Sequence, residues 1–138
     1  MADHRYRFET GGCPIEAALD ALGGRWKGLL LFKICMQTRR FHELRKTVPH
    51  ISQRMLVRQL RELERDGLVT RAVALGVPAK VEYSPTAAAV ALQPLLLGLR
   101  DWAAYHMMGM PAGSLSARSQ PFRSAAPKPG ARRQPVLR

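Results

Sequence analysis

Residues 51–67 read ISQRMLVRQLRELERDG, the most informative run of the chain. Ser52 is a type of residue that caps the start of a helix and Gly67 a type that ends one, so we predict a helix from Ser52 to Asp66. At about 100° per residue, three leucines fall within roughly 60° of one another. They are Leu56, Leu60 and Leu63, bordered by Met55 and Gln59. Such a stripe predicts that this side of the helix faces a core.

The opposite side of this helix carries a row of arginines, flanked by acidic residues. The row consists of Arg54, Arg58, Arg61 and Arg65. Like charges three or four positions apart lower the stability of a helix, so we interpret the row as a surface for an external anion rather than as a solvated charged face. DNA phosphates fit such a surface, and arginine also binds O6 and N7 of guanine. Ser52 and Gln53, at the start of the helix, are further candidates for contact with DNA.

The residues before this helix predict a helix-turn-helix. A short helix is expected at 41–47, with Phe41 and Leu44 on one side. Pro49 disfavours a helical conformation at the preceding residue, which predicts a turn over 47–51. A short helix, a turn and a helix with an arginine face together match the arrangement with which proteins enter the major groove.

The residues after this helix predict a hairpin. Short strands are expected at 68–74 and 80–84, around a loop that contains Gly76 and Pro78. Lys80, at the tip of this wing, is placed to contact a phosphate or the minor groove. The predicted fold class is therefore mainly α with a small β-hairpin wing (α+β), a winged helix-turn-helix.

Three further helices are expected, at 14–22, at about 25–36 and from Thr86 to about 108. Pro94 lies inside the last of them and is expected to bend or break it. The second helix offers several side chains for the core. They are Trp26, Leu29, Leu30 and Ile34.

The charge of the chain indicates its partner. The 138 residues include 22 Lys and Arg against 10 Asp and Glu, a net charge of +12. A surplus of this size indicates nucleic acid or an anionic membrane. No segment reads as a signal peptide or a spanning helix, so no membrane role is expected. Double-stranded DNA is the expected partner; the alternative is a non-specific nucleic-acid-binding protein driven by basic charge, which shows little preference between a promoter and random duplex.

Composition also predicts the organisation of the chain. Residues 111–138 hold six of the basic residues, no acidic residue and five of the ten prolines, and they lack periodicity. We expect a disordered basic tail there, a winged helix-turn-helix over 12–110 and an N-terminal arm over 1–11.

Neither an enzyme, nor a metal site, nor a cofactor is expected. No two histidines have the spacing of metal ligands, the chain lacks a Cys-x-x-Cys pair, and no glycine-rich phosphate loop is present. The histidines are His4, His42, His50 and His106. Two cysteines do not make a disulfide framework, and a reducing cytoplasm fits them best.

Several runs of sequence resemble the signatures of the HxlR-type winged-helix regulators, in the same order. They are CPIE at 13–16, LDALGGRWK at 19–27, FHELR at 41–45, ISQRML at 51–56, QLRELERDG at 59–67 and VPAKVEYS at 77–84. The similarity covers about residues 12–106. The chain departs from the family's pattern at Pro85 and at TAAA over 86–89, and the basic tail lies outside the family core.

The resemblance implies a bacterial, MarR-like transcriptional regulator that binds a palindromic operator as a homodimer, in the cytoplasm at the nucleoid. It also implies that the first and last helices build the dimer. The last helix has an apolar stripe that fits this role, although packing on its own domain is the alternative. The stripe comprises Leu92, Leu95, Leu96, Leu99 and Ala103, with Trp102 and His106 at its edge.

Cys13 is the candidate redox-sensing residue. The resemblance implies this role, because some members of the family sense oxidants or electrophiles through a cysteine near the N-terminus. A helix N-terminus favours the reactive thiolate of a cysteine, whereas Glu16, one turn on, opposes it. A structural cysteine beneath the N-terminal arm is the open alternative. Cys35, near the end of an apolar helix, is expected to be a buried core residue.

Overall fold

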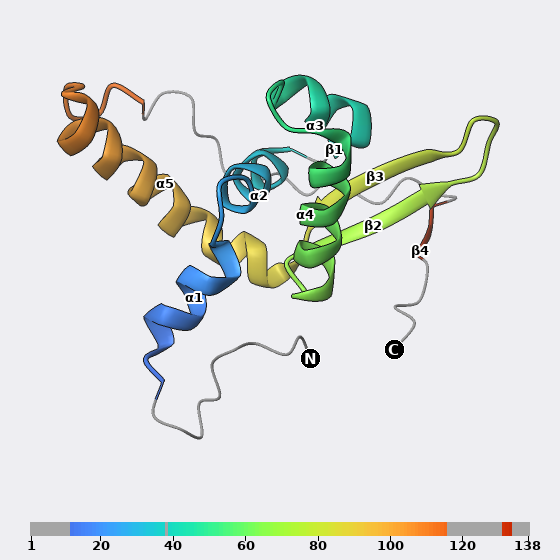
Figure 1. Ribbon diagram of the computed structural model, residues 1–138, viewed down its shortest axis with the longest axis horizontal. Coiled ribbons are helices and arrows are strands. Elements are labelled where there is room, and N and C mark those ends of the chain that lie inside the picture. Colours follow the sequence, from blue (N-terminus) through green and yellow to red (C-terminus); the bar gives the residue numbers. More distant parts are fainter. Residues whose placement is uncertain (1–11, 38, 116–130, 134–138) are drawn as a thin grey trace.

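The computed structural model describes residues 12–37, 39–115 and 131–133. Within these residues the chain forms five helices and four strands (Figure 1). In order they are α1 (Pro14–Leu22), α2 (Lys27–Met36), β1 (Arg39–Arg40), α3 (Phe41–Thr47), α4 (Gln53–Arg65), β2 (Val69–Ala74), β3 (Lys80–Pro85), α5 (Ala87–Met108) and β4 (Ala131–Arg133). The winged helix-turn-helix fold predicted from the sequence is confirmed. The N-terminal arm and most of the tail lie outside the described residues.

Local capping explains where α4 begins and ends. The side chain of Ser52 accepts a hydrogen bond from the backbone N–H of Met55 at 3.1 Å, as expected of an N-cap. Gly67 has φ of +73°, a conformation that glycine adopts readily because it lacks a Cβ. The N–H of Leu68 then donates back to the carbonyl of Leu63 at 3.0 Å. This closing turn ends the helix and directs the chain into β2.

Helix α2 lies at the centre of the core and packs against α4, α5 and β3. Its buried side chains are Leu30, Leu31, Ile34 and Cys35. The leucine stripe of α4, predicted to face the core, is buried as expected. The prediction for Leu29 is wrong, because this side chain is 39% exposed. Since α2 is apolar on almost every side, its periodicity did not indicate which face turns inward.

The sheet is antiparallel, with strand order β1-β3-β2-β4. Strands β2 and β3 form the predicted hairpin, which extends away from the helices (Figure 1). The sequence did not predict β1 or β4. Strand β1 has only two residues, too few for an alternating pattern to show. Strand β4 pairs with β2 through three residues of the segment expected to be a disordered tail, so that expectation does not hold for them.

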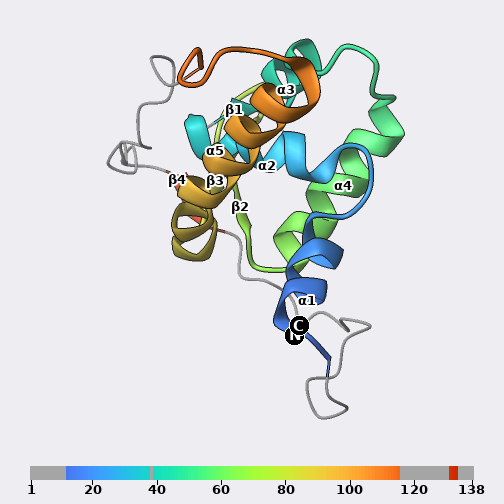
Figure 2. The same ribbon diagram turned by 90° about the vertical axis from the view of Figure 1, so that its left-hand side faces the viewer.

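Helix α5 begins beside the C-terminal end of α4, although the hairpin separates the two helices in the sequence. The hydroxyl of Thr86 accepts from the N–H of Ala89 at 3.3 Å and donates to the carbonyl of Gly67 at 2.7 Å. The helix continues through Pro94, so the proline does not break it. Figure 2 shows α5 lying in front of α2 and the sheet. Its apolar stripe is divided, because Leu96 is buried in this chain's own core whereas Leu99 is exposed.

Candidate nucleic-acid interface

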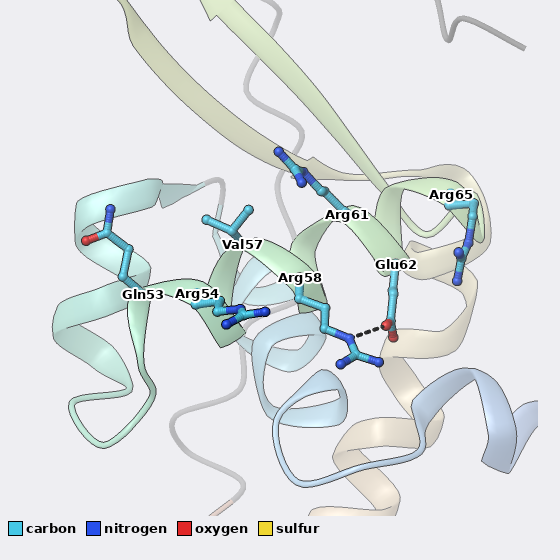
Figure 3. Close-up of a pocket in the computed structure, with 7 residues that line it drawn as sticks. All are labelled: Gln53, Arg54, Val57, Arg58, Arg61, Glu62 and Arg65. Atoms are coloured by element: carbon cyan, nitrogen blue, oxygen red, sulfur yellow. Dashed lines mark hydrogen bonds and ion pairs between the residues drawn. The ribbon is translucent and has the colours of Figure 1, made fainter.

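The four arginines of α4 lie along one exposed face of the helix, opposite the buried leucines. Together with Gln53, Val57 and Glu62 they line an open groove (Figure 3). Helix periodicity is sufficient to explain this separation, because leucine and arginine occupy opposite sides of the same turn. The outer face of α4 thus presents several guanidinium groups that can donate hydrogen bonds to an anion.

Glu62 connects this face to the helix behind it. Its carboxylate accepts from Nζ of Lys27, on α2, at 2.9 Å and from Nε of Arg58 at 3.2 Å. These bonds hold the pKa of the Glu62 carboxyl below its ordinary value, and the bond from Lys27 has the largest effect. Partial burial of the carboxyl opposes them. The arginine row is therefore partly compensated at Arg58. In the described part of the chain, Arg54 and Arg61 form no ion pair within 4.0 Å.

The first residue of α4 is held by the preceding helix. Nη1 of Arg45, in α3, donates to Oε1 of Gln53 at 3.1 Å, and both side chains are exposed. The sequence pattern indicated Gln53 but not Arg45. The FHELR run at 41–45 contains this arginine, but which surface it shares became visible only once α3 and α4 were placed.

A second hollow separates α4 from the hairpin. It is lined by Phe41, Val57, Arg61, Glu64, Arg71, Val81 and Tyr83. The hydroxyl of Tyr83 is hydrogen-bonded to Arg71, and burial raises the pKa of this tyrosine above its ordinary value. Arg71, on β2, is a second basic residue that the sequence pattern did not indicate. It brings positive charge to the gap between the helix and the wing.

Two predicted site residues lie away from the arginine row. Lys80 is the first residue of β3, at the tip of the hairpin, and it lines a separate hollow with Arg40 and His42. Cys13 is the N-cap of α1 and is exposed; its backbone N–H donates to the Glu16 carboxylate at 3.3 Å. Figure 1 shows α1 on the side of the molecule opposite the hairpin.

Cys35 is buried, as predicted. Its Sγ donates to the carbonyl of Ala89 at 3.5 Å, and burial raises the pKa of the thiol to about 11. The same part of the core holds Gln93, whose Nε2 donates to the carbonyl of Cys35 at 3.2 Å. Both contacts join α2 to α5, which indicates that Cys35 serves packing rather than reactivity.

The described residues offer neither a metal-binding cluster nor a membrane-spanning helix. They contain no group of three or more His, Cys, Asp or Glu side chains that could hold a metal ion. None of the helices in the described part of the chain is long and apolar enough to cross a membrane.

A family model described as HxlR-like helix-turn-helix matches residues 21–110, which is more than half of the chain. This chain belongs to the HxlR-like helix-turn-helix family. YdeP of Bacillus subtilis (strain 168), an uncharacterized HTH-type transcriptional regulator, is 53% identical over 91 residues, covering 66% of this chain and 71% of YdeP. The HxlR-like chain is accordingly a DNA-binding transcriptional regulator, and its relatives are regulators rather than enzymes.

Solved structures support the same assignment. The redox regulator HypR in its oxidized form superposes with a TM-score of 0.64 at 47% identity, covering 68% of this chain and 97% of HypR. The reduced form of YodB from B. subtilis superposes with a TM-score of 0.63 at 37% identity, covering 72% of this chain and 99% of YodB. Quinone-bound YodB is also similar, with a TM-score of 0.56 at 38% identity, covering 66% of this chain and 97% of YodB. The HxlR-like fold thus extends over about two thirds of this chain.

Proposed function

We propose that this chain binds a specific operator as a homodimer, with α4 in the major groove and the β2–β3 hairpin beside the adjacent minor groove. The observation that carries the proposal is the exposed arginine face of α4, next to a wing. Arg54 and Arg58, near the start of the helix, are proposed to contact base edges, because the first turns of a recognition helix enter the groove. Arg61, Arg65 and Lys80 are proposed to contact phosphates, and Ser52 to hold the start of the helix.

A mobility-shift titration tests the assignment of the arginine face. Arg54→Ala and Arg58→Ala are each expected to weaken operator binding by roughly 1–3 kcal/mol. Lys33→Ala, on α2, is the matched control, because it removes the same charge outside the groove that α4 lines. Unchanged affinity of both arginine variants, with melting temperatures equal to wild type, refutes the assignment. Equal affinity of wild type for operator and random duplex supports a charge-driven, non-specific binder instead.

The proposed dimer rests on apolar surface that this chain leaves uncovered. Helix α1 has no buried residue although most of its residues are apolar, and Ile15 and Leu19 are exposed on it. On α5, Leu95, Leu99 and Trp102 are exposed as well. Figure 1 shows both helices on the side of the molecule opposite the hairpin. A two-fold axis through this side would place two recognition helices about 34–36 Å apart, one turn of DNA.

Light scattering tests the dimer. A mass of twice the 15.4 kDa of one chain is expected at micromolar concentration. Leu99→Asp is expected to shift the mass to that of one chain, because it places a charge in the contact, while Leu75→Asp at the exposed hairpin tip leaves it unchanged. A wild-type monomer refutes the dimer and, with it, the palindromic operator.

We further propose that Cys13 responds to oxidants or electrophiles and thereby releases DNA. The exposed thiol stands at the start of α1, one of the two helices assigned to the dimer, so a modification there would alter the geometry of the interface. The names of HypR, a redox regulator, and of quinone-bound YodB support this role. DNA binding before and after quinone treatment is the test, with Cys13→Ser as control. The switch is refuted if mass spectrometry shows that Cys13 of the wild type is modified and the protein still binds the operator with full affinity.

The proposed place of action follows from the proposed partner. A protein that binds operators works at the chromosome, which in a bacterium lies in the cytoplasm as the nucleoid. Fluorescence microscopy of a tagged chain is expected to show it co-localised with stained DNA, and a signal at the cell envelope would contradict this.

A further inference from the structure

The contact between Arg45 and Gln53 lies at the end of α4 that is proposed to enter the major groove. Nη1 of Arg45 donates to Oε1 of Gln53 at 3.1 Å, and neither side chain is buried. The N-cap bond from Met55 to Ser52 holds the first turn of α4, so the backbone beneath Gln53 is ordered. Figure 3 shows Gln53 at the opposite end of the groove from Arg65.

The chemistry of the pair determines how the amide of Gln53 is oriented. A guanidinium group has N–H donors and no acceptor, so only the amide oxygen of Gln53 can face Arg45. The amide nitrogen, with its two donors, is therefore turned away from Arg45 and is available to a partner outside the protein. The remaining N–H groups of Arg45 are donors as well. Together the two side chains present hydrogen-bond donors to the DNA.

We infer that Arg45 and Gln53 together recognise a guanine, with Arg45 as a specificity-determining residue that acts through Gln53. The major-groove edge of guanine presents two acceptors, N7 and O6, whereas that of adenine presents N7 beside an amino group. A glutamine without a partner binds adenine with both amide atoms, because its oxygen accepts from the amino group. Arg45 occupies that oxygen and sets its own N–H groups against the adenine amino group. The pair therefore favours guanine over adenine at one base pair of each half-site.

This inference rests on the proposed operator binding and adds the base that one part of the interface selects. Selection of binding sites from random duplex DNA tests it with wild type, Arg45→Ala and Lys46→Ala. Lys46 is the matched control, because it is the next residue of α3, is exposed and carries the same charge. Wild type and Lys46→Ala are expected to select the same guanine, and Arg45→Ala is expected to select adenine at that position.

Titrations on paired duplexes measure the size of the effect. Wild type is expected to prefer the guanine duplex by about tenfold to a hundredfold, and Arg45→Ala to lose at least about tenfold of that preference. Gln53→Ala is expected to lose the discrimination too, and 7-deazaguanine, which lacks the N7 acceptor, to weaken wild-type binding. If Arg45→Ala selects the wild-type sequence, or Gln53→Ala keeps the guanine preference, the inference is overturned and the proposed function stands. A wild type that enriches no sequence overturns both.

Discussion

Replacing Glu62 with glutamine is expected to destabilise the protein and at the same time to strengthen its binding to DNA. Glu62 lies between a nearly buried partner and an exposed one. The side chain of Lys27 is 11% exposed and that of Arg58 is 70% exposed, while Glu62 itself is 21% exposed. The two ion pairs therefore differ in their environment. Although Glu62→Gln removes both of them, measurements of stability and of DNA binding on this one variant separate their roles.

The loss of stability is expected to come from Lys27. A hydrogen bond between charged groups contributes about 1.5–3 kcal/mol, and glutamine keeps an oxygen that can accept, so the expected cost is about 1–2 kcal/mol. The exposed pair with Arg58 adds little, because water screens it. For a domain of this size each kcal/mol lowers the melting temperature by about 4–8 °C. A decrease of roughly 4–16 °C at pH 7 is therefore expected.

The pH dependence has a definite sign. Since the pKa of Glu62 is lowered in the folded protein, its carboxylate contributes stability that is complete above its ordinary value of 4.5 and is lost as pH falls below it. The difference in melting temperature between wild type and Glu62→Gln is therefore expected at pH 7 and should shrink below about pH 4.5.

DNA binding is expected to change in the opposite direction. Glu62 pairs with Arg58, so it would compete with the base edge that Arg58 is proposed to contact, and its negative charge lies on the groove. Neutralising it is expected to improve binding by about twofold to fivefold near 0.1 M salt, since exposed charges at a few Å interact by less than about 1 kcal/mol. The improvement should decrease as salt is added.

Thermal melts and fluorescence-anisotropy titrations measure the two effects on one preparation. Glu64→Gln is the control, because it removes the same charge from α4 but has neither of the two contacts of Glu62. A Glu62→Gln variant that melts like this control refutes a stabilising role for Lys27 and Glu62. Binding weaker than that of the control refutes the competition for Arg58.

Three further predictions concern the core, the tail and the thiols. Leu60 is 1% exposed, so Leu60→Ala is expected to lower the free energy of unfolding by about 2–5 kcal/mol in a urea titration. A loss below about 1 kcal/mol would contradict the place of Leu60 in the core. Truncation after Leu115 removes six positive charges together with β4 and is expected to flatten the salt dependence of DNA binding; an equally steep dependence would show that the tail does not contact DNA. At pH 8, iodoacetamide is expected to alkylate Cys13, which is exposed, and to leave Cys35 unmodified until the protein is denatured. Cys35 is protected because a thiol with a pKa of about 11 holds little thiolate. Two alkylations on the native protein, detected by mass spectrometry, would contradict this.

Features that depend on neighbouring residues were predictable from the sequence. The start of α4 at Ser52, its end at Gly67 and the start of α5 after Thr86 all agree with the structure, because capping acts within one helical turn. The separation of leucine from arginine on α4 was predictable for a similar reason. Where one side of a helix is apolar and the other charged, only one orientation toward a core is possible.

Features without a local signal were not predictable. Helix α2 is apolar on almost every side, so only its neighbours decided that Leu31 turns inward and Leu29 outward. On α5, contact with the core of this chain covered Leu96 and left Leu99 exposed. The apolar stripe of α5 looks like one surface in the sequence, but the structure divides it into a buried part and an exposed part. The reason is that only one side of α5 packs against the core of this chain.

The sequence alone was sufficient for the order of the five helices and of the hairpin strands β2 and β3, for the winged helix-turn-helix and for the arginine face of α4. Which distant residues meet on that face depends on how the helices pack together. Arg45 reaches Gln53 across the turn between α3 and α4, and Lys27 on α2 reaches Glu62 over 35 positions of sequence. Periodicity and capping describe one element at a time, whereas a contact between two elements depends on how their buried faces pack together.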